Sequence, residues 1–252
     1  MKVMLLAAGR GERMGELTAN CPKPLLKVAG KPLIEHHIER LVAAGFSHVV
    51  INVCYLADQI MTYLGDGSRW DITIQYSQEA ECLETGGGIV RALNAKLLDD
   101  APFLVINGDV WTDYPLATLT SALSCSSDKE VDAHLVLVPN PDHNVAGDFC
   151  LNESMGLLST KPLSKDLPSI NGFASHDQAA CHTFAGISVM RPHLFANSGL
   201  GYAGVDAAGA IVEKFPLAPL LKQAMGLEHV TGELYQGEWV DVGTPERLAS
   251  LN

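Results

Sequence analysis

Short apolar runs alternate along this chain with stretches in which apolar residues recur every three or four positions. The apolar runs predict buried strands at 3–8, 47–53, 72–76 and 103–106. The helically spaced stretches predict helices between and after them, at 33–42, 56–64 and 89–97. Strand and helix therefore alternate, which predicts an α/β fold. We expect a Rossmann-like, doubly wound sheet that is mixed but mostly parallel and is flanked by helices.

The pattern is less regular in the second half. Strands are predicted at 133–138 and 184–189, and between them the segment 158–181 is polar and shows no periodicity. We expect that segment to be an inserted loop or lid.

Three polar residues are expected to have structural roles. Asp113 precedes a predicted helix over 116–123, and Thr244 precedes Pro245, so both are predicted helix caps. His37 lies on the apolar stripe of the first helix and is expected to be a half-buried, hydrogen-bonded histidine rather than a ligand.

A glycine-rich loop follows the first predicted strand, with glycines at 9, 11 and 15. Glycine lets backbone N–H groups approach an anion closely, and Arg13 and Lys23 add positive charge, so the loop is predicted to bind phosphate. It is not a Walker A loop, because Gly11 is not followed by Lys and Ser or Thr. The glycine spacing and the distance to the first helix also exclude a dinucleotide-binding fingerprint.

Two carboxylates follow predicted strands. Asp109 comes after the run 103–106, and Asp241 follows a short strand that begins at Trp239. Ligands in open α/β sheets gather beyond the carboxyl ends of strands, so Asp109 is expected near the phosphate loop. Both are candidate metal ligands, and Mg²⁺ suits their oxygens.

The glycine run 86–88, which opens a helix, leaves backbone donors free beside a surface that a planar base could cover.

Composition limits the partners and the compartment. A net charge of -12, without a run of Lys or Arg, argues against nucleic-acid binding. The six cysteines are scattered and form no C-x-x-C pair, so reduced thiols and a cytoplasmic location are expected. The apolar start is too short for a signal peptide, and no segment predicts contact with a membrane.

Several motifs resemble those of the sugar-1-phosphate nucleotidyltransferases. They are LAAGRGERM at 6–14, PKPLLKVAGKPLIEH at 22–36, LETGGGI at 83–89, NGDVWTDY at 107–114, FAGISV at 184–189 and WVDVGTPERL at 239–248. The resemblance spans nearly the whole chain and implies one nucleotidyltransferase domain over 1–252. Its nucleotide-binding half would be about 1–130, and its sugar-binding half, including a small lid, about 131–252.

The resemblance also implies an activity, and the uridylyltransferases of the family are the most similar. We therefore expect Mg²⁺-dependent transfer of a uridylyl group from UTP to N-acetylmuramate alpha-1-phosphate, a reaction of cell-wall recycling that releases pyrophosphate. Guanylyl, thymidylyl or adenylyl transfer to a hexose 1-phosphate is an alternative, since the phosphate and metal groups are common to all. A non-catalytic nucleotide or nucleotide-sugar sensor is an alternative of another class.

The site residues are carried over motif by motif. Arg13 and Lys23 are the expected catalytic residues, and Asp109 and Asp241 the expected Mg²⁺ ligands. The expected nucleotide contacts are Leu6, Ala8, Gly9, Gly11, Glu12, Arg13, Lys23, Glu81, Gly86 and Asn107. The expected contacts to the sugar phosphate are Asp148, Thr183, Glu213 and Lys214.

Overall fold

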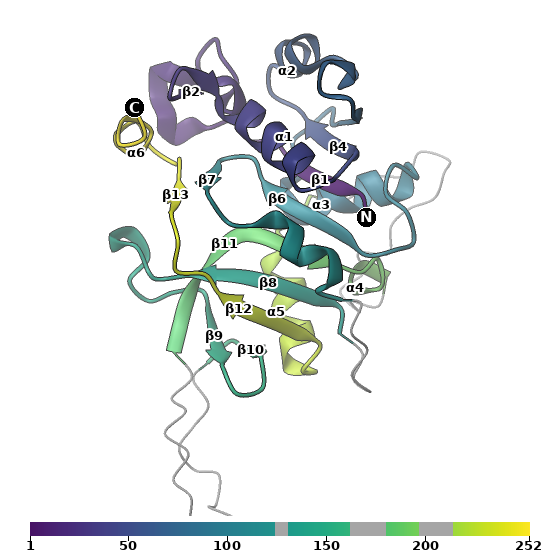
Figure 1. The fold of residues 1–252 in the computed structure, drawn as a ribbon, viewed down its shortest axis with the longest axis vertical. Helices are drawn as coiled ribbons and strands as arrows, with labels where there is room; N and C mark the ends of the chain where they lie inside the picture. Colours follow the sequence, from purple (N-terminus) through teal and green to yellow (C-terminus); the bar gives the residue numbers. More distant parts are fainter. Residues whose placement is uncertain (124–130, 162–179, 197–213) are drawn as a thin grey trace, which may run out of the picture.

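The computed structural model describes residues 1–123, 131–161, 180–196 and 214–252. One nine-stranded sheet, in the order β5-β4-β1-β6-β11-β8-β12-β10-β9, contains strands from both halves of the chain (Figure 1). Its first half consists of β1 (Val3–Leu6), β4 (His48–Val53), β5 (Thr73–Gln78) and β6 (Phe103–Asn107). The second half consists of β8 (Ala133–Val138), β9 (Phe149–Asn152), β10 (Leu157–Ser159), β11 (Ala180–Met190) and β12 (Val230–Leu234).

The sheet is mixed, as predicted, but it is parallel mainly in its first half. There β1 pairs in parallel with β4 and β6, and β4 with β5. In the second half β11 runs antiparallel to both β6 and β8, and β10 runs antiparallel to its neighbours β9 and β12. The expectation of a mostly parallel sheet is therefore wrong for this half, where β8 with β12 is the one parallel pair among the described strands.

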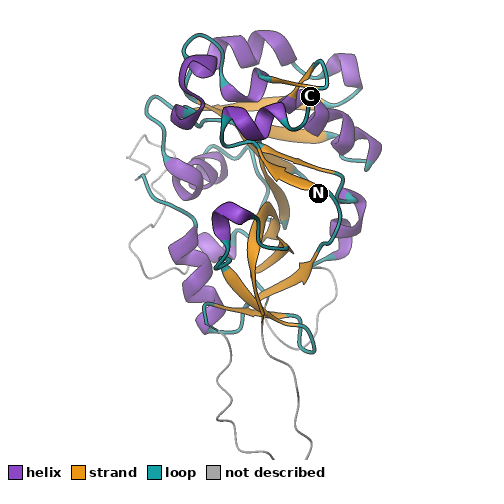
Figure 2. Cartoon of the chain, turned by 90° about the vertical axis from the view of Figure 1, so that its left-hand side faces the viewer, coloured by secondary structure: helices purple, strands orange, loops and turns teal. Residues whose placement is uncertain are grey.

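Helices cover both faces of the sheet. Successive strand residues point to opposite faces, so Leu5 packs with α1 (Leu33–Ala43) and α2 (Ala57–Leu64), whereas Met4 packs with α3 (Glu84–Asn94) and α5 (Ala218–Gly226). The short α4 (His193–Ala196) belongs to the second layer. Figure 2 shows the sheet edge-on with helices on either side. The doubly wound arrangement is thus present.

The C-terminal segment returns to the beginning of the chain. Strand β13 (Trp239–Asp241) pairs with β7 (Val110–Thr112), and α6 (Pro245–Ala249) lies beside the hairpin of β2 (Lys27–Val28) and β3 (Lys31–Pro32) (Figure 1). A third apolar cluster fills the space between them: Met14, Val28, Leu33, Val242 and Leu248. Both ends of the chain therefore take part in one corner of the molecule.

The two predicted caps have different outcomes. Thr244 accepts a hydrogen bond from the Arg247 backbone N–H at 3.4 Å, with Pro245 in the first turn of α6, so this cap is confirmed. Asp113 caps no helix, since the 3₁₀ segment Leu116–Ser121 has no side-chain cap. Its carboxylate instead accepts the backbone N–H of Glu238 at 2.8 Å, a residue that folding alone brings near.

His37 is more deeply buried than predicted. Its exposure is 3%, and its Nε2 atom has no hydrogen-bond partner among the described residues. Burial, and after it the charge of nearby Arg40, lowers the pKa of this imidazole to about 4, so the ring is neutral at physiological pH.

Four cysteines are paired, contrary to the expectation of reduced thiols. Cys150 and Cys181 lie directly opposite one another on β9 and β11, and Cys54 and Cys82 follow the neighbouring parallel strands β4 and β5. Strand pairing brings each pair together, which the scattered sequence positions do not reveal. Cys21 is a free thiol in the described part of the chain, which does not include Cys125.

The predicted lid lies largely outside the described residues, which omit 162–179. Its described ends are strand residues, since β10 includes Leu158 and β11 includes Cys181. The described helices include none that could span a bilayer.

Candidate active site

Strands β1 and β6 lie side by side in parallel and end together, with Leu6 opposite Asn107. The next residue, Gly108, donates its N–H to the Leu6 carbonyl at 2.8 Å. A Cβ atom at this glycine would lie only 2.4 Å from that carbonyl oxygen. The close approach, which requires glycine, brings Asp109 to the start of the glycine-rich loop.

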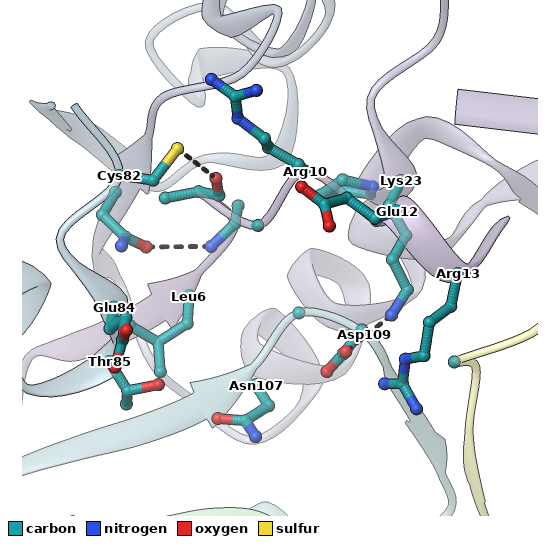
Figure 3. A pocket seen from close by; sticks show the side chains of 18 of the residues that line it. Leu6, Arg10, Glu12, Arg13, Lys23, Cys82, Glu84, Thr85, Asn107 and Asp109 are labelled. Atoms are coloured by element: carbon teal, nitrogen blue, oxygen red, sulfur yellow. Dashed lines mark hydrogen bonds and ion pairs between the residues drawn. The ribbon is translucent and has the colours of Figure 1, made fainter. Parts of the chain in front are cut away.

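The loop after β1 turns sharply at Gly11, whose φ is 66°. Its carbonyl accepts the Met14 N–H at 2.8 Å and the Thr18 hydroxyl at 3.0 Å, and both of these side chains are buried. The 3₁₀ segment Glu12–Thr18 is thereby anchored to the core. Arg13 projects from this anchored turn beside the cavity (Figure 3).

The pairing of β7 with β13 brings the two candidate metal ligands together. Asp241 lies opposite Val110, and the Val242 N–H donates to the Asp109 carbonyl at 2.8 Å. Asp109, just before β7, is thus one residue from the position opposite Asp241, although the two are far apart in sequence. Asp109 lines the cavity described below, whereas Asp241 lies next to the lining residue Gly243 and is not itself in the lining. Their carboxylates are 38% and 23% exposed, so both remain accessible to a ligand.

Each of these carboxylates contacts a cation. Figure 3 shows the Lys23 ammonium directed at Asp109, and the two groups lie 2.6 Å apart. The Arg247 guanidinium lies 3.1 Å from Asp241. The ring of His143, from the second half of the chain, lies 3.6 Å from the same Asp241 oxygen atom. Because Lys23 is 7% exposed, salt and solvent screen its ion pair less than they screen a surface pair. The cations fix both carboxylates in place.

The opposite wall of the cavity is built on β5 and the start of α3. It presents Cys82, Glu84 and Thr85 (Figure 3). Beneath them the Glu79 carboxylate is 6% exposed, and burial raises its pKa, while hydrogen bonds from Leu83 and Asn52 oppose the rise.

The cavity between these walls has a volume of about 510 Å³, a size that suits a small-molecule ligand. Side chains and backbone from the loop, from both walls and from the C-terminal segment line it. The lining residues are Leu6, Ala7, Ala8, Gly9, Arg10, Gly11, Glu12, Arg13, Lys23, Pro24, Asn52, Cys82, Glu84, Thr85, Asn107, Gly108, Asp109, Lys214 and Gly243.

Most of the predicted nucleotide contacts therefore lie around one cavity. The exceptions are Glu81, which is exposed and outside the lining, and Gly86, which is buried. A Cβ atom at Gly86 would lie 2.2 Å from the ring of Phe215, so this glycine allows α3 to pack closely rather than exposing backbone to a ligand.

The predicted sugar-phosphate contacts are dispersed. Lys214 lines the cavity and lies 3.8 Å from Glu84, whereas Glu213 falls outside the described residues. Thr183 is 5% exposed and exchanges hydrogen bonds with the side chains of Asn140 and Asn144, and the carboxylate of Asp148 accepts the N–H of Phe184. In this structure Thr183 and Asp148 organise the turn before β9.

Sequence reasoning did not identify Asn52, Arg247 or His143 as part of the site. Nothing in the local sequence around Asn52 indicates that its side chain reaches the loop after β1. Gly243 had a visible signal, since it follows Asp241 in the C-terminal motif. A Cβ atom there would lie 2.3 Å from Arg247, 2.9 Å from Asp241 and 3.1 Å from Arg13.

The donor set suits a hard divalent cation. Asp109, just before β7, and Asp241, at the end of β13, offer carboxylate oxygens. The described residues contain no cluster of three or more His, Cys, Asp or Glu that would enclose a metal by itself. Mg²⁺ usually takes one or two protein carboxylates and completes its octahedron with water and phosphate oxygens. These residues therefore fit Mg²⁺ better than a metal that needs a full protein cage.

Comparison with known proteins agrees with this chemistry. Residues 2–147 match the family model described as nucleotidyl transferase. The chain is 45% identical over 249 residues to an N-acetylmuramate alpha-1-phosphate uridylyltransferase of Neisseria meningitidis, covering 98% of this chain and 95% of the relative. It is 32% identical to the enzyme of the same name from Caulobacter vibrioides, over 96% and 92% of the two chains. It is also 35% identical to a mannose-1-phosphate guanyltransferase of Hypocrea jecorina, over 99% of this chain and 63% of the relative.

Solved structures share the fold at low sequence identity. A Bacillus anthracis protein described as a glucose-1-phosphate thymidylyltransferase superposes with a TM-score of 0.76 at 17% identity, over 100% of this chain and 94% of that one. HddC of Yersinia pseudotuberculosis, in complex with GMP-PN, gives a TM-score of 0.68 at 19% identity, over 99% and 97%. At such identities the likeness extends to the fold alone.

Proposed function

This chain belongs to the nucleotidyl transferase family, and we propose that it transfers a uridylyl group from UTP to N-acetylmuramate alpha-1-phosphate. The products are UDP-N-acetylmuramate and pyrophosphate. The single observation that carries the choice of substrates is the 45% identity, over nearly the full length of both chains, to a relative with this named activity. The resemblance to sugar-1-phosphate nucleotidyltransferases predicted from the sequence is confirmed.

The residues that line the cavity support separate roles for the two halves of the chain, one in nucleotide binding and one in acceptor binding. We assign the nucleotide to the half at about 1–130, where the glycine-rich loop holds the triphosphate and the wall of Cys82, Glu84 and Thr85 faces the base. The acceptor enters from the half at about 131–252, whose Lys214 lines the same cavity. The family model, which matches 2–147, covers the nucleotide half.

The reaction is a displacement at the α-phosphorus of UTP. A phosphate oxygen of the sugar 1-phosphate forms a bond to that phosphorus, and the bond to the β-phosphate oxygen breaks, releasing pyrophosphate. A phosphate monoester has a second pKa near ~6, so the nucleophile is already ionised at neutral pH and needs no general base. This agrees with a site that lacks a Ser-His-Asp or Cys-His arrangement among its lining residues.

The main barrier that the protein must lower is electrostatic. Two unit charges of the same sign repel by about 4 kcal/mol at ~4 Å and an effective dielectric constant of 20. Arg13 and Lys23 lie where they can neutralise the triphosphate, and the backbone N–H groups of the loop can orient it. Asp109 and Asp241 are the residues that would hold Mg²⁺, which when bound supplies positive charge shared by the phosphates.

A second candidate is guanylyl transfer to mannose 1-phosphate. It is supported by the 35% identity to a mannose-1-phosphate guanyltransferase, which extends over 99% of this chain. The loop, the aspartates and the two cations serve either reaction equally, so the base and the sugar alone discriminate between the candidates.

The test is a matrix of the four nucleoside triphosphates against N-acetylmuramate, N-acetylglucosamine, glucose and mannose 1-phosphates, with Mg²⁺. Pyrophosphate release and nucleotide-sugar formation are both measured. We expect the highest kcat/KM for UTP with N-acetylmuramate alpha-1-phosphate. A preference for GTP with mannose 1-phosphate would favour the second candidate, and no release with any pair would favour a nucleotide sensor.

A further inference from the structure

A buried chain of three hydrogen bonds joins the two walls of the cavity. The Ala7 N–H donates to Asn52 Oδ1 at 2.9 Å, Asn52 Nδ2 donates to Glu79 Oε1 at 2.8 Å, and the Leu83 N–H donates to Glu79 Oε2 at 2.8 Å. The Asn52 and Glu79 side chains are only 3% and 6% exposed. The chain runs from the start of the phosphate loop to the residue between Cys82 and Glu84.

Helix α3 passes directly behind the middle bond, and a Cβ atom at Gly88 would lie 2.8 Å from both Asn52 Nδ2 and Glu79 Oε1. The absence of a side chain at this glycine is therefore what admits the bond.

The far end of the hydrogen-bond chain holds a strained backbone. Glu84 adopts a φ of 61°, a conformation that residues other than glycine seldom adopt. The preceding Leu83 is fixed on both sides, since its N–H donates to Glu79 and its carbonyl accepts the N–H of Phe215 at 3.2 Å. These bonds hold Glu84 and Thr85 at the cavity wall in spite of the strain.

We propose that Asn52 and Glu79 are positioning residues that set the distance between the phosphate loop and the base-facing wall, and thereby determine which nucleobase is accepted. This inference rests on the proposed function in one respect, namely that the wall of Cys82, Glu84 and Thr85 faces the base. Glu79 lies beneath that wall, outside the cavity lining, so it acts through Leu83 rather than by contact with the nucleotide. Asn52 lines the cavity, but its Oδ1 and Nδ2 atoms are both engaged, by Ala7 and by Glu79, so it also acts through these bonds.

Donor and acceptor chemistry explains why this pair of residue types is needed. Both ends of the chain are backbone donors, so the side chains between them must offer an acceptor to each and still pair with one another. An asparagine and a carboxylate meet this requirement, because the amide accepts once and donates once while the carboxylate accepts twice. Glu79→Gln leaves one amide donor facing another and breaks one of the three bonds. Asn52→Asp sets two carboxylates against each other.

The double variant Asn52→Asp/Glu79→Gln restores all three bonds. The new carboxylate at position 52 accepts from Ala7 and from the new amide at position 79, and the carbonyl of that amide accepts from Leu83. The middle bond reverses its direction and the charge moves by one side chain, but the geometry is kept. A charge-swapped pair that recovers function separates positioning from the chemistry of either residue alone.

The experiment measures the ratio of kcat/KM for UTP to kcat/KM for CTP, with the acceptor saturating. CTP carries the same triphosphate, so any effect of the moved charge on phosphate binding cancels in the ratio. We expect each single variant to lower the ratio about tenfold, the scale that one broken buried hydrogen bond contributes to discrimination. The double variant should return it to within about twofold of wild type, given typical additivity errors.

Ser77→Ala is the matched control. Ser77 lies on β5 two residues before Glu79, is 3% exposed, and its hydroxyl has no hydrogen-bond partner among the described residues. Its removal should leave the ratio unchanged.

The outcomes separate the alternatives. If the single variants lower kcat/KM equally for both nucleotides and melt earlier, the pair is only structural and the inference is overturned. Failure of the double variant to recover the ratio overturns it too. If a single variant is insoluble, the double variant provides the test. It should be soluble and should show the wild-type ratio of kcat/KM values, and an insoluble double variant would count against the inference. Should wild type prefer a base other than uracil, the proposed function fails, and the same variants are compared on the preferred base and its closest analogue.

Discussion

Asp109 and Asp241 each have a charge partner within the protein. Asp109 contacts Lys23 at 2.6 Å and Asp241 contacts Arg247 at 3.1 Å. A cation shared by the two aspartates would draw on carboxylates whose orientation is already fixed, which lowers the entropy lost on binding. Under the proposed function both aspartates hold the same Mg²⁺, so the two residues should act as one unit.

Asp109→Asn and Asp241→Asn test that unit. Each replacement keeps the shape and one oxygen acceptor for the neighbouring cation, but removes a charge, so each should lose most of the turnover, roughly 100-fold or more. Because both act through one ion, the double variant should lose far less than the product of the single losses. The measurement is kcat against Mg²⁺ concentration, and fully multiplicative losses would contradict a shared ion. Lys31→Met is the control, since its exposed ion pair with Glu39 lies on the surface away from the cavity lining.

His37 provides a residue-scale prediction on pH. Burial, Arg40 and His36 together lower its pKa in the folded protein to about 4, against an opposing effect of Asp109. In the unfolded chain this histidine has a pKa of about 6.5, so between about pH 6.5 and 4 it is protonated when unfolded and neutral when folded. The free energy of unfolding therefore decreases as pH falls from about 6.5 towards 4. By the same linkage, this loss amounts to at most about 3 kcal/mol at the lower end.

Urea unfolding at several pH values checks this. His37→Leu should remove most of the loss in that window, and it also removes a buried nitrogen that has no hydrogen-bond partner among the described residues. The exposed His48 gives a matched control, because His48→Leu should keep the acid sensitivity of wild type. Parallel stability curves for wild type and His37→Leu would contradict the prediction.

At the scale of secondary-structure elements, the site depends on how closely strand ends approach. Gly108 lies against the Leu6 carbonyl, so Gly108→Ala must separate the ends of β1 and β6 or shift Asp109. We expect a loss of about 1–3 kcal/mol of stability, as for other overpacked positions, and a lower kcat. Gly226→Ala is the control, because a Cβ atom at the end of α5 meets nothing within 4 Å and should not lower the melting temperature. Equal melting temperatures for the two variants would contradict the close-approach argument.

Elements with strong local periodicity were predictable, and elements that depend on distant partners were not. The pattern identified β1, α1, β4, α2, β5, α3 and β6, where burial on a parallel sheet leaves apolar runs. It gave no sign of β9, β10 or β12, which are short or polar and are stabilised by pairing.

The same distinction applies to single residues of the site. Arg13, Lys23 and Asp109 lie in or beside recognisable local motifs, and all three line the cavity. Asn52 could not be found in this way, because its importance comes from a hydrogen bond to Ala7, 45 residues away. Asp113 was wrongly predicted as a cap for a related reason, since its partner Glu238 is 125 residues away.

At the scale of the whole molecule, both ends of the chain build the cavity. The loop at 6–13 and Gly243 line it together, and Asn252 ties the last residue to the β2–β3 hairpin by accepting the Ala29 N–H at 2.8 Å. Net charge is -12, yet the lining contains Arg10, Arg13, Lys23 and Lys214. The same lining contains the carboxylates of Glu12, Glu84 and Asp109, so its four cations slightly outnumber its three anions in a chain that is strongly acidic as a whole.

The packing of the C-terminal segment against the beginning of the chain leads to a final prediction. Leu248 on α6 is 9% exposed and packs with Met14, Val28 and Leu33, so Leu248→Ala should lower the free energy of unfolding by about 2–3 kcal/mol. The same helix carries Arg247, which holds Asp241, so loosening it should also raise the Mg²⁺ concentration needed for half-maximal activity. Leu227→Ala is the matched control, because Leu227 is 62% exposed and its truncation should change neither quantity. Urea unfolding and Mg²⁺ titration of both variants decide the matter. A Leu248→Ala variant that is less stable but has an unchanged Mg²⁺ requirement would show that α6 supports the fold without ordering the metal ligand. A lower free energy of unfolding together with a higher Mg²⁺ requirement would link the stability of the C-terminal segment to the chemistry at Asp241.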